Sequence, residues 1–246
     1  GVRCYKNIAM LDFKTRSSAP EILDDFSLKG HDLEVNLKEL EAVNRWLGGY
    51  RVTLRGLKRA IGDETAKTWR VIDCGCGAGD TLIEMAEWGR HRAVDLQLTG
   101  IDANSTAVQY AMKQAGRTPN LRFKMVNILS PQFLRLPADL VTFNLFLHHF
   151  SEDEIVDFLI QCRKKNAAII INDLHRNKVA YHLFRLLSRI FRFSRIGRHD
   201  GKLSVKKGFV KRDWQRLFAQ AGIENYSIEW RWAFRWLCVV RKEVKY

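Results

Sequence analysis

The amino-acid sequence predicts an α/β fold in which helices cover both faces of a parallel, doubly wound sheet. From residue 69 onward, short apolar strands alternate with amphipathic helices, which is the pattern of such a sheet. The first strand, at 69–73, runs directly into a glycine-rich turn at 75–79, which leaves backbone open to a ligand. The last two strands, 225–232 and 234–241, lie too close in sequence for a parallel crossover, so they form an antiparallel pair.

The composition is that of a globular protein of ordinary domain size. The chain has 246 residues, of which 46% are hydrophobic and 28% charged, and this is enough to bury a substantial core. No apolar run approaches the roughly 18–20 residues of a membrane span, and the first residues lack the pattern of a secretory signal. The five cysteines are scattered without metal-ligand spacing. We therefore expect a cytoplasmic protein with reduced cysteines.

Two amphipathic helices precede the first strand. Apolar residues recur at three- and four-residue spacing between 33 and 47, and two glycines end that helix. A second helix over 52–61 is again closed by a glycine. We expect residues 1–64 to form an N-terminal helical cap and residues 65–246 to form the α/β domain.

The elements of the α/β domain follow in order. Strands are expected at 69–73, 96–102, 121–126, 139–145, 167–171, 225–232 and 234–241. Helices are expected at about 80–88, 104–115 and 210–221, and the capping-box sequence from Ser151 to Glu154 opens another. The fifth strand is fully apolar, which indicates burial on both faces. Residues 174–208 interrupt the alternation and form an insert.

The spacing of the glycine-rich turn argues against a pyrophosphate ligand. Asp73 closes the first strand and glycines follow at 75, 77 and 79, whereas a dinucleotide loop needs its third glycine at position 80. This pattern resembles motif I of the class I S-adenosylmethionine-dependent methyltransferases. The resemblance implies a Rossmann-like, seven-stranded sheet with an antiparallel last strand. It also implies S-adenosyl-L-methionine as cofactor, S-adenosyl-L-homocysteine as product and no metal.

The resemblance covers about 65–246 and places cofactor contacts at strand ends. Asp102, which closes the second strand, is implied to bind both ribose hydroxyls, with Ala103 beside the adenine. After the third strand the family's usual Asp is replaced by Asn127, whose amide oxygen can still accept a hydrogen bond. Asn144 and Leu145 are implied to pass near the methionine moiety. The full implied set is Asp73, Gly75, Cys76, Gly77, Gly79, Asp102, Ala103, Asn127, Ile128, Asn144 and Leu145.

The sequence Leu47-Gly48-Gly49-Tyr50-Arg51 resembles a stretch that a bacterial group of methyltransferases carries ahead of motif I. By this resemblance, we hypothesise that Arg51 pairs with the methionine carboxylate and that Tyr50 packs over the site. The alternative is that the glycines cap a helix and Arg51 is solvated.

Methyl transfer to a hydroxyl or a carbon acid needs a base, and histidine is the natural one near neutral pH. Four candidates follow the carboxyl ends of strands, where ligands bind in open α/β sheets: His148, His149, Asp173 and His175. The sequence does not choose between the two adjacent histidines. The alternatives are that the histidines only shape the pocket floor and that Asp173 caps a helix.

The net charge of +14 is concentrated in one segment. Residues 163–216 contain 16 Lys and Arg against 3 acids, and the rest of the chain nearly balances. Within this segment, 177–195 reads as a basic amphipathic helix that forms a lid over the substrate side. Three roles stay open for it: a helix packed on the domain with a solvated basic face, peripheral contact with anionic lipid, or capture of an acidic substrate.

The motif after the fourth strand, from Asp139 to His149, and the stretch from Gly208 to Trp214 look like those of small-molecule methyltransferases of bacterial polyketide and quinone pathways. The expected reaction is methylation of an oxygen, or a carbon, of a small, partly apolar metabolite that is lipid-like or anionic. One alternative is an RNA or DNA methyltransferase that uses the basic 163–216 segment. Against it, the fourth strand lacks the Asn/Asp-Pro-Pro-aromatic signature. Another is a non-enzymatic nucleotide-binding protein of the same fold.

Overall fold

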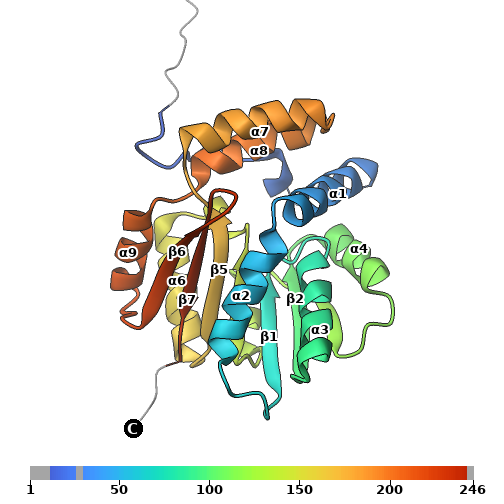
Figure 1. The fold of residues 1–246 in the computed structure, drawn as a ribbon, viewed down its shortest axis with the longest axis vertical. Helices are drawn as coiled ribbons and strands as arrows, with labels where there is room; N and C mark the ends of the chain where they lie inside the picture. Colours follow the sequence, from blue (N-terminus) through green and yellow to red (C-terminus); the bar gives the residue numbers. More distant parts are fainter. Residues whose placement is uncertain (1–11, 26–29, 243–246) are drawn as a thin grey trace, which may run out of the picture.

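A computed structural model of the chain describes residues 12–25 and 30–242. Cys4 and the first 11 residues of the expected cap lie outside this part. The described residues contain one seven-stranded sheet of order β3-β2-β1-β4-β5-β7-β6 (Figure 1). Its strands are β1 (Trp69–Cys74), β2 (Leu96–Asp102), β3 (Leu121–Met125), β4 (Leu140–Asn144), β5 (Ala168–Leu174), β6 (Tyr226–Arg231) and β7 (Arg235–Val240). Strands β1 to β5 pair in parallel and β7 is antiparallel to both its neighbours, which confirms the predicted fold class.

Helices cover both faces of the sheet and its carboxyl edge. The helices are α1 (His31–Trp46), α2 (Gly49–Ile61), α3 (Asp80–Arg92), α4 (Ser105–Ala115), α5 (Pro131–Arg135), α6 (Glu152–Lys164), α7 (Lys178–Ile190), α8 (Arg195–Lys207) and α9 (Lys211–Gln220), with short 3-10 turns η1 (Ile22–Asp24) and η2 (Leu147–His149). The side chains of α2, α3 and α4 form one buried cluster with one sheet face, and those of α6 and α9 form another with the opposite face. No helix in the described part of the chain combines the length and apolarity that crossing a bilayer requires.

Most predicted elements are found, and the differences have local causes. The fifth strand continues through Asn172 and Asp173 to Leu174, because antiparallel β7 pairs with it along this whole length. Asp173 therefore lies inside a strand, and its expected alternative role as a helix cap is wrong. The insert contains two helices. The sequence predicts only the first, because only there do apolar residues recur at helical spacing. Helix α8 has few apolar residues and is held by its contacts with α7 and η1.

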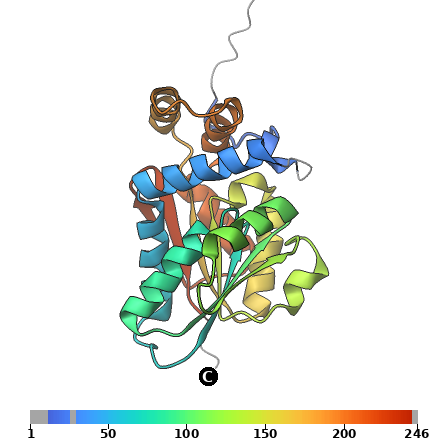
Figure 2. The same ribbon diagram turned by 90° about the vertical axis from the view of Figure 1, so that its right-hand side faces the viewer.

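The helices α1, α7 and α8 lie together above the carboxyl ends of the strands (Figures 1 and 2). Helices α7 and α8 pack closely: a Cβ on Gly201 of α8 would lie 2.1 Å from the ring of Phe184 on α7. The N-terminal segment 12–25 runs beneath them. Arg16 of this segment donates to the carbonyls of His148, Phe150 and Lys207, so it ties η2 to the end of α8.

Candidate active site

The carboxyl edge of the sheet and the helices above it enclose a cavity of about 660 Å³. Its floor comes from the turns after β1, β2, β3 and β4, and its roof from α1, α7 and α8. The floor carries most of the polar groups, whereas α7 and one side of α1 line the roof with leucine and phenylalanine. The apolar roof residues include Leu37, Leu40, Val43, Leu47, Leu183, Phe184, Leu187 and Phe193, and the polar ones are Asn36, Glu39, Asn44, Asp200 and Ser204. A ligand with one polar and one apolar end fits this division.

The glycine-rich turn after β1 has left-handed backbone at all three glycines. The φ angles of Gly75, Gly77 and Gly79 are +67°, +49° and +75°, which side chains with a Cβ adopt at a cost. A Cβ on Gly75 would overlap the Phe146 ring, whereas one on Gly77 would meet only Leu37 at 3.5 Å. The turn is therefore packed tightly at its start and open to the cavity at Gly77. Gly79 does not line the cavity but caps α3, so its role is structural.

Asp102 sits at the end of β2, where its two carboxylate oxygens hold the neighbouring backbone. One oxygen accepts from the Gly77 N–H at 3.1 Å and the other from the Asn104 N–H at 2.9 Å. Burial raises the pKa of this carboxyl, and the two N–H bonds oppose that rise. Because each oxygen can accept a second hydrogen bond, Asp102 is able to take two neighbouring hydroxyls. Ala103, Asn127 and Ile128 line the cavity next to it.

A buried polar network joins β1, β4, β5 and α2. The Asp73 carboxylate accepts from the Thr142 hydroxyl at 2.6 Å and from the Asn144 amide at 2.7 Å. Asn144 in turn accepts from Thr53, which accepts from Asn172. Burial raises the pKa of Asp73 to about 7, although both hydrogen bonds act against the rise. Asp73 and Asn144 line the cavity, as do Cys76 and Leu145, so this carboxylate is placed to meet a cation.

Arg235, at the start of β7, is a cationic group of the cavity wall that sequence reasoning missed. Arg235 is 1% exposed, and among the described residues only one of its guanidinium nitrogens has a hydrogen-bond partner, the Asn44 side-chain oxygen at 3.1 Å. The Nε and the other terminal nitrogen have no hydrogen-bond partner among the described residues. Burial lowers its pKa to about 10, so it remains charged at neutral pH. A buried guanidinium with free donors facing a cavity is suited to a carboxylate.

Arg51 lies elsewhere. It is exposed on the solvent side of α2 and is not among the residues that line the cavity. Its side chain instead packs near Gly48, which caps α2 in a left-handed conformation. Tyr50 is buried but donates its hydroxyl to Asp80 at 2.7 Å. The alternative interpretation of this stretch, helix-capping glycines followed by a solvated Arg51, is the one that matches the geometry.

Three of the four candidate catalytic residues line the cavity, and the fourth, Asp173, contacts one of them. His148 is buried, and its Nδ1 lies 2.7 Å from the Asp173 carboxylate, which is 0% exposed. Burial disfavours the charge on Asp173, but His148 and the Leu174 N–H outweigh this and lower its pKa. An ionised carboxylate only accepts hydrogen bonds, so Nδ1 carries the proton and Nε2 is left as the basic nitrogen. His149 has the same arrangement with Asp24 at 2.6 Å but is partly exposed.

His175 also lines the cavity but has a different environment. Its Nδ1 is buried without a hydrogen-bond partner among the described residues, and its ring packs against Trp236. Burial lowers its pKa, so the imidazole is neutral at pH 7.

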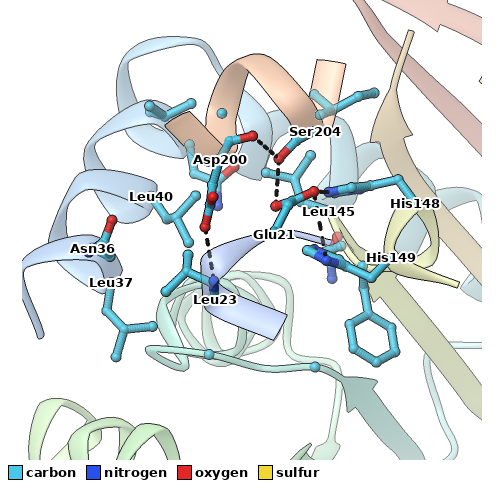
Figure 3. A pocket seen from close by; sticks show the side chains of 18 of the residues that line it. Glu21, Leu23, Asn36, Leu37, Leu40, Leu145, His148, His149, Asp200 and Ser204 are labelled. Carbon is cyan, nitrogen blue, oxygen red and sulfur yellow. Dashed lines mark hydrogen bonds and ion pairs between the residues drawn. The ribbon is translucent and has the colours of Figure 1, made fainter. Parts of the chain in front are cut away.

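Glu21, from the N-terminal segment, completes the polar floor (Figure 3). Its Oε1 lies 3.8 Å from the Nε2 of His148, 3.9 Å from the Nδ1 of His149 and 3.4 Å from the Lys207 ammonium. Its other oxygen accepts from the Ser204 hydroxyl at 2.8 Å. Burial raises the pKa of Glu21, while His149 and Lys207 oppose the rise. Only the mixture of turn and acidic residues at 20–25 hinted at this group in the sequence.

Glu21, His148 and His149 offer ligand atoms close enough together to hold a metal ion. Their other partners do not favour this role. The Lys207 ammonium already lies 3.4 Å from Glu21 and 3.2 Å from Asp24, and Asp24 occupies the Nδ1 of His149. A fixed cation therefore neutralises the carboxylates that a metal would need.

Comparison with known proteins agrees with this arrangement. Residues 71–165 match a protein family described as "Methyltransferase domain". No curated protein matched the chain significantly. Among solved structures, an O-methyltransferase family protein from Burkholderia thailandensis is 15% identical, with a TM-score of 0.62 over 94% of this chain and 66% of that one. A SAM-dependent methyltransferase from Aquifex aeolicus is 15% identical, with a TM-score of 0.58 over 83% of this chain and 95% of its own.

A plantazolicin methyltransferase in complex with SAH is 17% identical, with a TM-score of 0.55 over 81% of this chain and 82% of its own. The chain spans only about half, 47%, of the citrinin polyketide synthase CMeT domain chain that it also resembles. At these identities the structural matches show a shared fold. The family match spans β1 to α6, which includes the glycine-rich turn, Asp102 and the two histidines. Residues 71–165 are therefore similar to a methyltransferase domain, and the chain has the fold of S-adenosylmethionine-dependent methyltransferases.

Proposed function

We propose that this chain is an S-adenosylmethionine-dependent methyltransferase, and that it transfers a methyl group to an oxygen, or a carbon, of a small acceptor with an apolar part. One observation supports this proposal. A single cavity contains the Asp102 carboxylate, which can bind a nucleoside, the His148 imidazole, which is held by Asp173, and the apolar side chains of the roof. The structural neighbours include a putative O-methyltransferase, an O-methyltransferase family protein and a carbon methyltransferase, so the fold does not choose between oxygen and carbon as the acceptor atom.

The cofactor supplies an activated methyl group on a sulfonium, and the residues of the chain hold it. Asp102 takes the ribose hydroxyls, Ile128 and Ala103 flank the adenine, and Asn127 accepts from its amino group. Asp73 faces the ammonium of the methionine moiety, with Asn144 beside it. Arg235 takes the methionine carboxylate, in place of Arg51. Its two unpartnered nitrogens in the cavity wall support this assignment.

His148 is the general base of the proposed reaction. Asp173 fixes its tautomer and leaves Nε2 free to take the acceptor proton. Asp173 and Glu21 then lie on either side of the imidazolium that forms, which stabilises its charge. Removing a positioned base of this kind costs typically about 10²–10⁴ in rate.

Asp173→Asn tests this role, because it retains the shape but gives His148 a neutral partner. We expect turnover to fall about 100-fold while the calorimetric Kd for S-adenosylhomocysteine stays within about twofold. His149→Gln is the matched comparison and should have a smaller effect. Turnover is measured as S-adenosylhomocysteine formed from labelled S-adenosylmethionine with lipid, aqueous and RNA fractions of a lysate as acceptors. Full activity of Asp173→Asn would rule out the base assignment. Label entering the RNA fraction instead would rule out the small acceptor.

We further propose that the reaction needs no metal ion, because Lys207 neutralises Glu21 and Asp24 at the place where a metal would bind. Dialysis against a chelator is therefore expected to leave turnover unchanged, and Lys207→Met to reduce it. Loss of activity on chelation, with recovery on adding a divalent cation, would contradict this.

A further inference from the structure

Helix α7 presents an apolar stripe to solvent. Val179, Leu183, Leu186 and Ile190 are 56%, 40%, 55% and 61% exposed, and their spacing puts them on one line along the helix. The stripe is extended by Phe191, whose ring lies 4.8 Å from that of Trp46 at the end of α1. Both aromatic residues are largely exposed. Water-facing apolar stripes of this kind on a soluble fold mark interaction surfaces.

Cations flank the stripe, and no acid accompanies them. Lys178, Arg185, Arg189, Arg192, Arg195 and Arg198 are exposed, and the sequence has no Asp or Glu between 174 and 199. In the described part of the chain, none of these six residues forms an ion pair with a carboxylate. On a helical wheel, Arg185 and Arg189 fall on one side of the apolar line. Their charge is therefore available to an anionic partner.

The stripe borders the roof of the active-site cavity. Leu183 belongs to both, since it is exposed and also lines the cavity. Phe184 and Leu187, on the inner side of the same helix, line the cavity as well. Figure 2 shows α7 and α8 nearly end-on at the outer limit of the molecule, above α1. An apolar ligand that leaves a surface in contact with α7 has a short apolar path to the histidines.

We propose that α7 docks this enzyme on an anionic lipid bilayer, from which the acceptor enters the cavity. Apolar side chains with flanking arginines are the pattern of helices that lie in a membrane interface. A second copy of the chain would bring two like-charged surfaces together. A nucleic acid would leave the apolar stripe exposed to water. The inference deepens the proposed function, because it states where an apolar acceptor comes from.

Flotation tests the proposal with vesicles of phosphatidylcholine alone or with about one third phosphatidylglycerol. The wild-type protein is expected to float with the anionic vesicles, and less so as salt rises. Arg185→Gln with Arg189→Gln should weaken the partition about 30-fold, from the usual contribution of each cation near such a surface. Leu186→Glu with Ile190→Glu should abolish it. Met112→Glu replaces an equally exposed apolar residue on α4 and is the matched control.

Calorimetry with S-adenosylhomocysteine separates this test from that of the proposed function. None of these substitutions alters the cofactor-binding floor of the cavity, so all variants should bind S-adenosylhomocysteine as the wild type does. Normal cofactor binding without flotation would overturn the docking proposal and leave the methyltransferase site standing. Flotation without cofactor binding would support the docking proposal and overturn the methyltransferase site. Flotation of the Leu186/Ile190 variant at wild-type level, a dimer disrupted by that variant, or tighter binding to tRNA than to vesicles would each overturn docking.

Discussion

Arg235 shows how a single side chain can be charged, buried and still incompletely bonded. Two of its nitrogens have no protein partner in the described part of the chain, and leaving such donors unpaired is costly unless a ligand takes them. Asp73 has the opposite charge and a raised pKa of about 7. Both line the cavity, so an amino acid moiety with a carboxylate and an ammonium would satisfy both at once.

Arg235→Met is expected to raise the Kd for S-adenosylhomocysteine about 10–100-fold, since charge-assisted hydrogen bonds to a carboxylate are worth roughly 1.5–3 kcal/mol. Arg51→Met is the control, and its Kd should stay within about twofold of wild type. Near-ultraviolet circular dichroism confirms that both variants are folded. If only the Arg51 variant binds weakly, the sequence-based hypothesis is correct and the Arg235 assignment fails.

Cofactor affinity should depend on pH through Asp73. Its carboxyl is protonated below a pKa of about 7, and only the ionised form attracts an ammonium group. We therefore expect the affinity to fall as pH drops below 7, by at most about tenfold per pH unit. Asp73→Asn should bind weakly with a flatter profile in calorimetry from pH 5.5 to 8. An unchanged slope in this variant would assign the titration to another group.

At the scale of residues, the sequence predicts site residues that lie within a recognisable motif. It does not predict those that the fold brings to the site from distant parts of the chain. Asp102 and Asn144 close strands of a recognisable pattern, and both line the cavity. Arg235 begins the seventh strand, far from the turn it faces, and nothing in its local sequence distinguishes it from other arginines. Arg51 was assigned from a short resemblance, but the helical period turns its side chain to solvent.

At the scale of elements, the N-terminal segment behaves as a strap between η2 and α8. The Asp200 carboxylate, on α8, accepts from the N–H groups of Ile22 and Leu23 at 3.0 and 2.9 Å. Together with the Ser204 hydroxyl, which donates to Glu21, these bonds hold η1 beside the histidines (Figure 3). The amphipathic period of α7 was evident in the sequence. The strap was not, because its bonds join residues almost 180 positions apart.

Asp200→Asn should loosen this strap, because an amide nitrogen would then face one of the two backbone N–H donors. Each buried donor left unpaired costs about 1–3 kcal/mol. We expect hydrogen exchange in 12–25 to accelerate about 10–100-fold and turnover to fall, with cofactor affinity retained. His199→Gln removes only the exposed imidazole that also contacts Asp200 and is the control. Unchanged exchange in 12–25 would show that other contacts hold the segment.

At the scale of the whole molecule, a parallel sheet with an antiparallel last pair follows from the chain pattern, whereas the order of its strands does not. Apolar strands with intervening helices dictate right-handed parallel crossovers, and the short final link dictates an antiparallel edge. The active site depends on a further level of organisation. It requires the N-terminal strap, helices α7 and α8 and strand β7 to meet over the carboxyl edge of the sheet. The residues that make these contacts share no sequence periodicity, so the sequence does not predict them.

The anchoring of Arg16 on the carbonyls of His148 and Phe150 has a consequence for shortened forms of the protein. A product cleaved after residue 25 would keep the sheet, Asp102, Arg235 and the pair of His148 with Asp173, but it would lose the Glu21 carboxylate near Nε2 of His148. Such a fragment is expected to bind S-adenosylmethionine but to turn it over more slowly. Truncation at the amino terminus would thereby separate cofactor binding from catalysis.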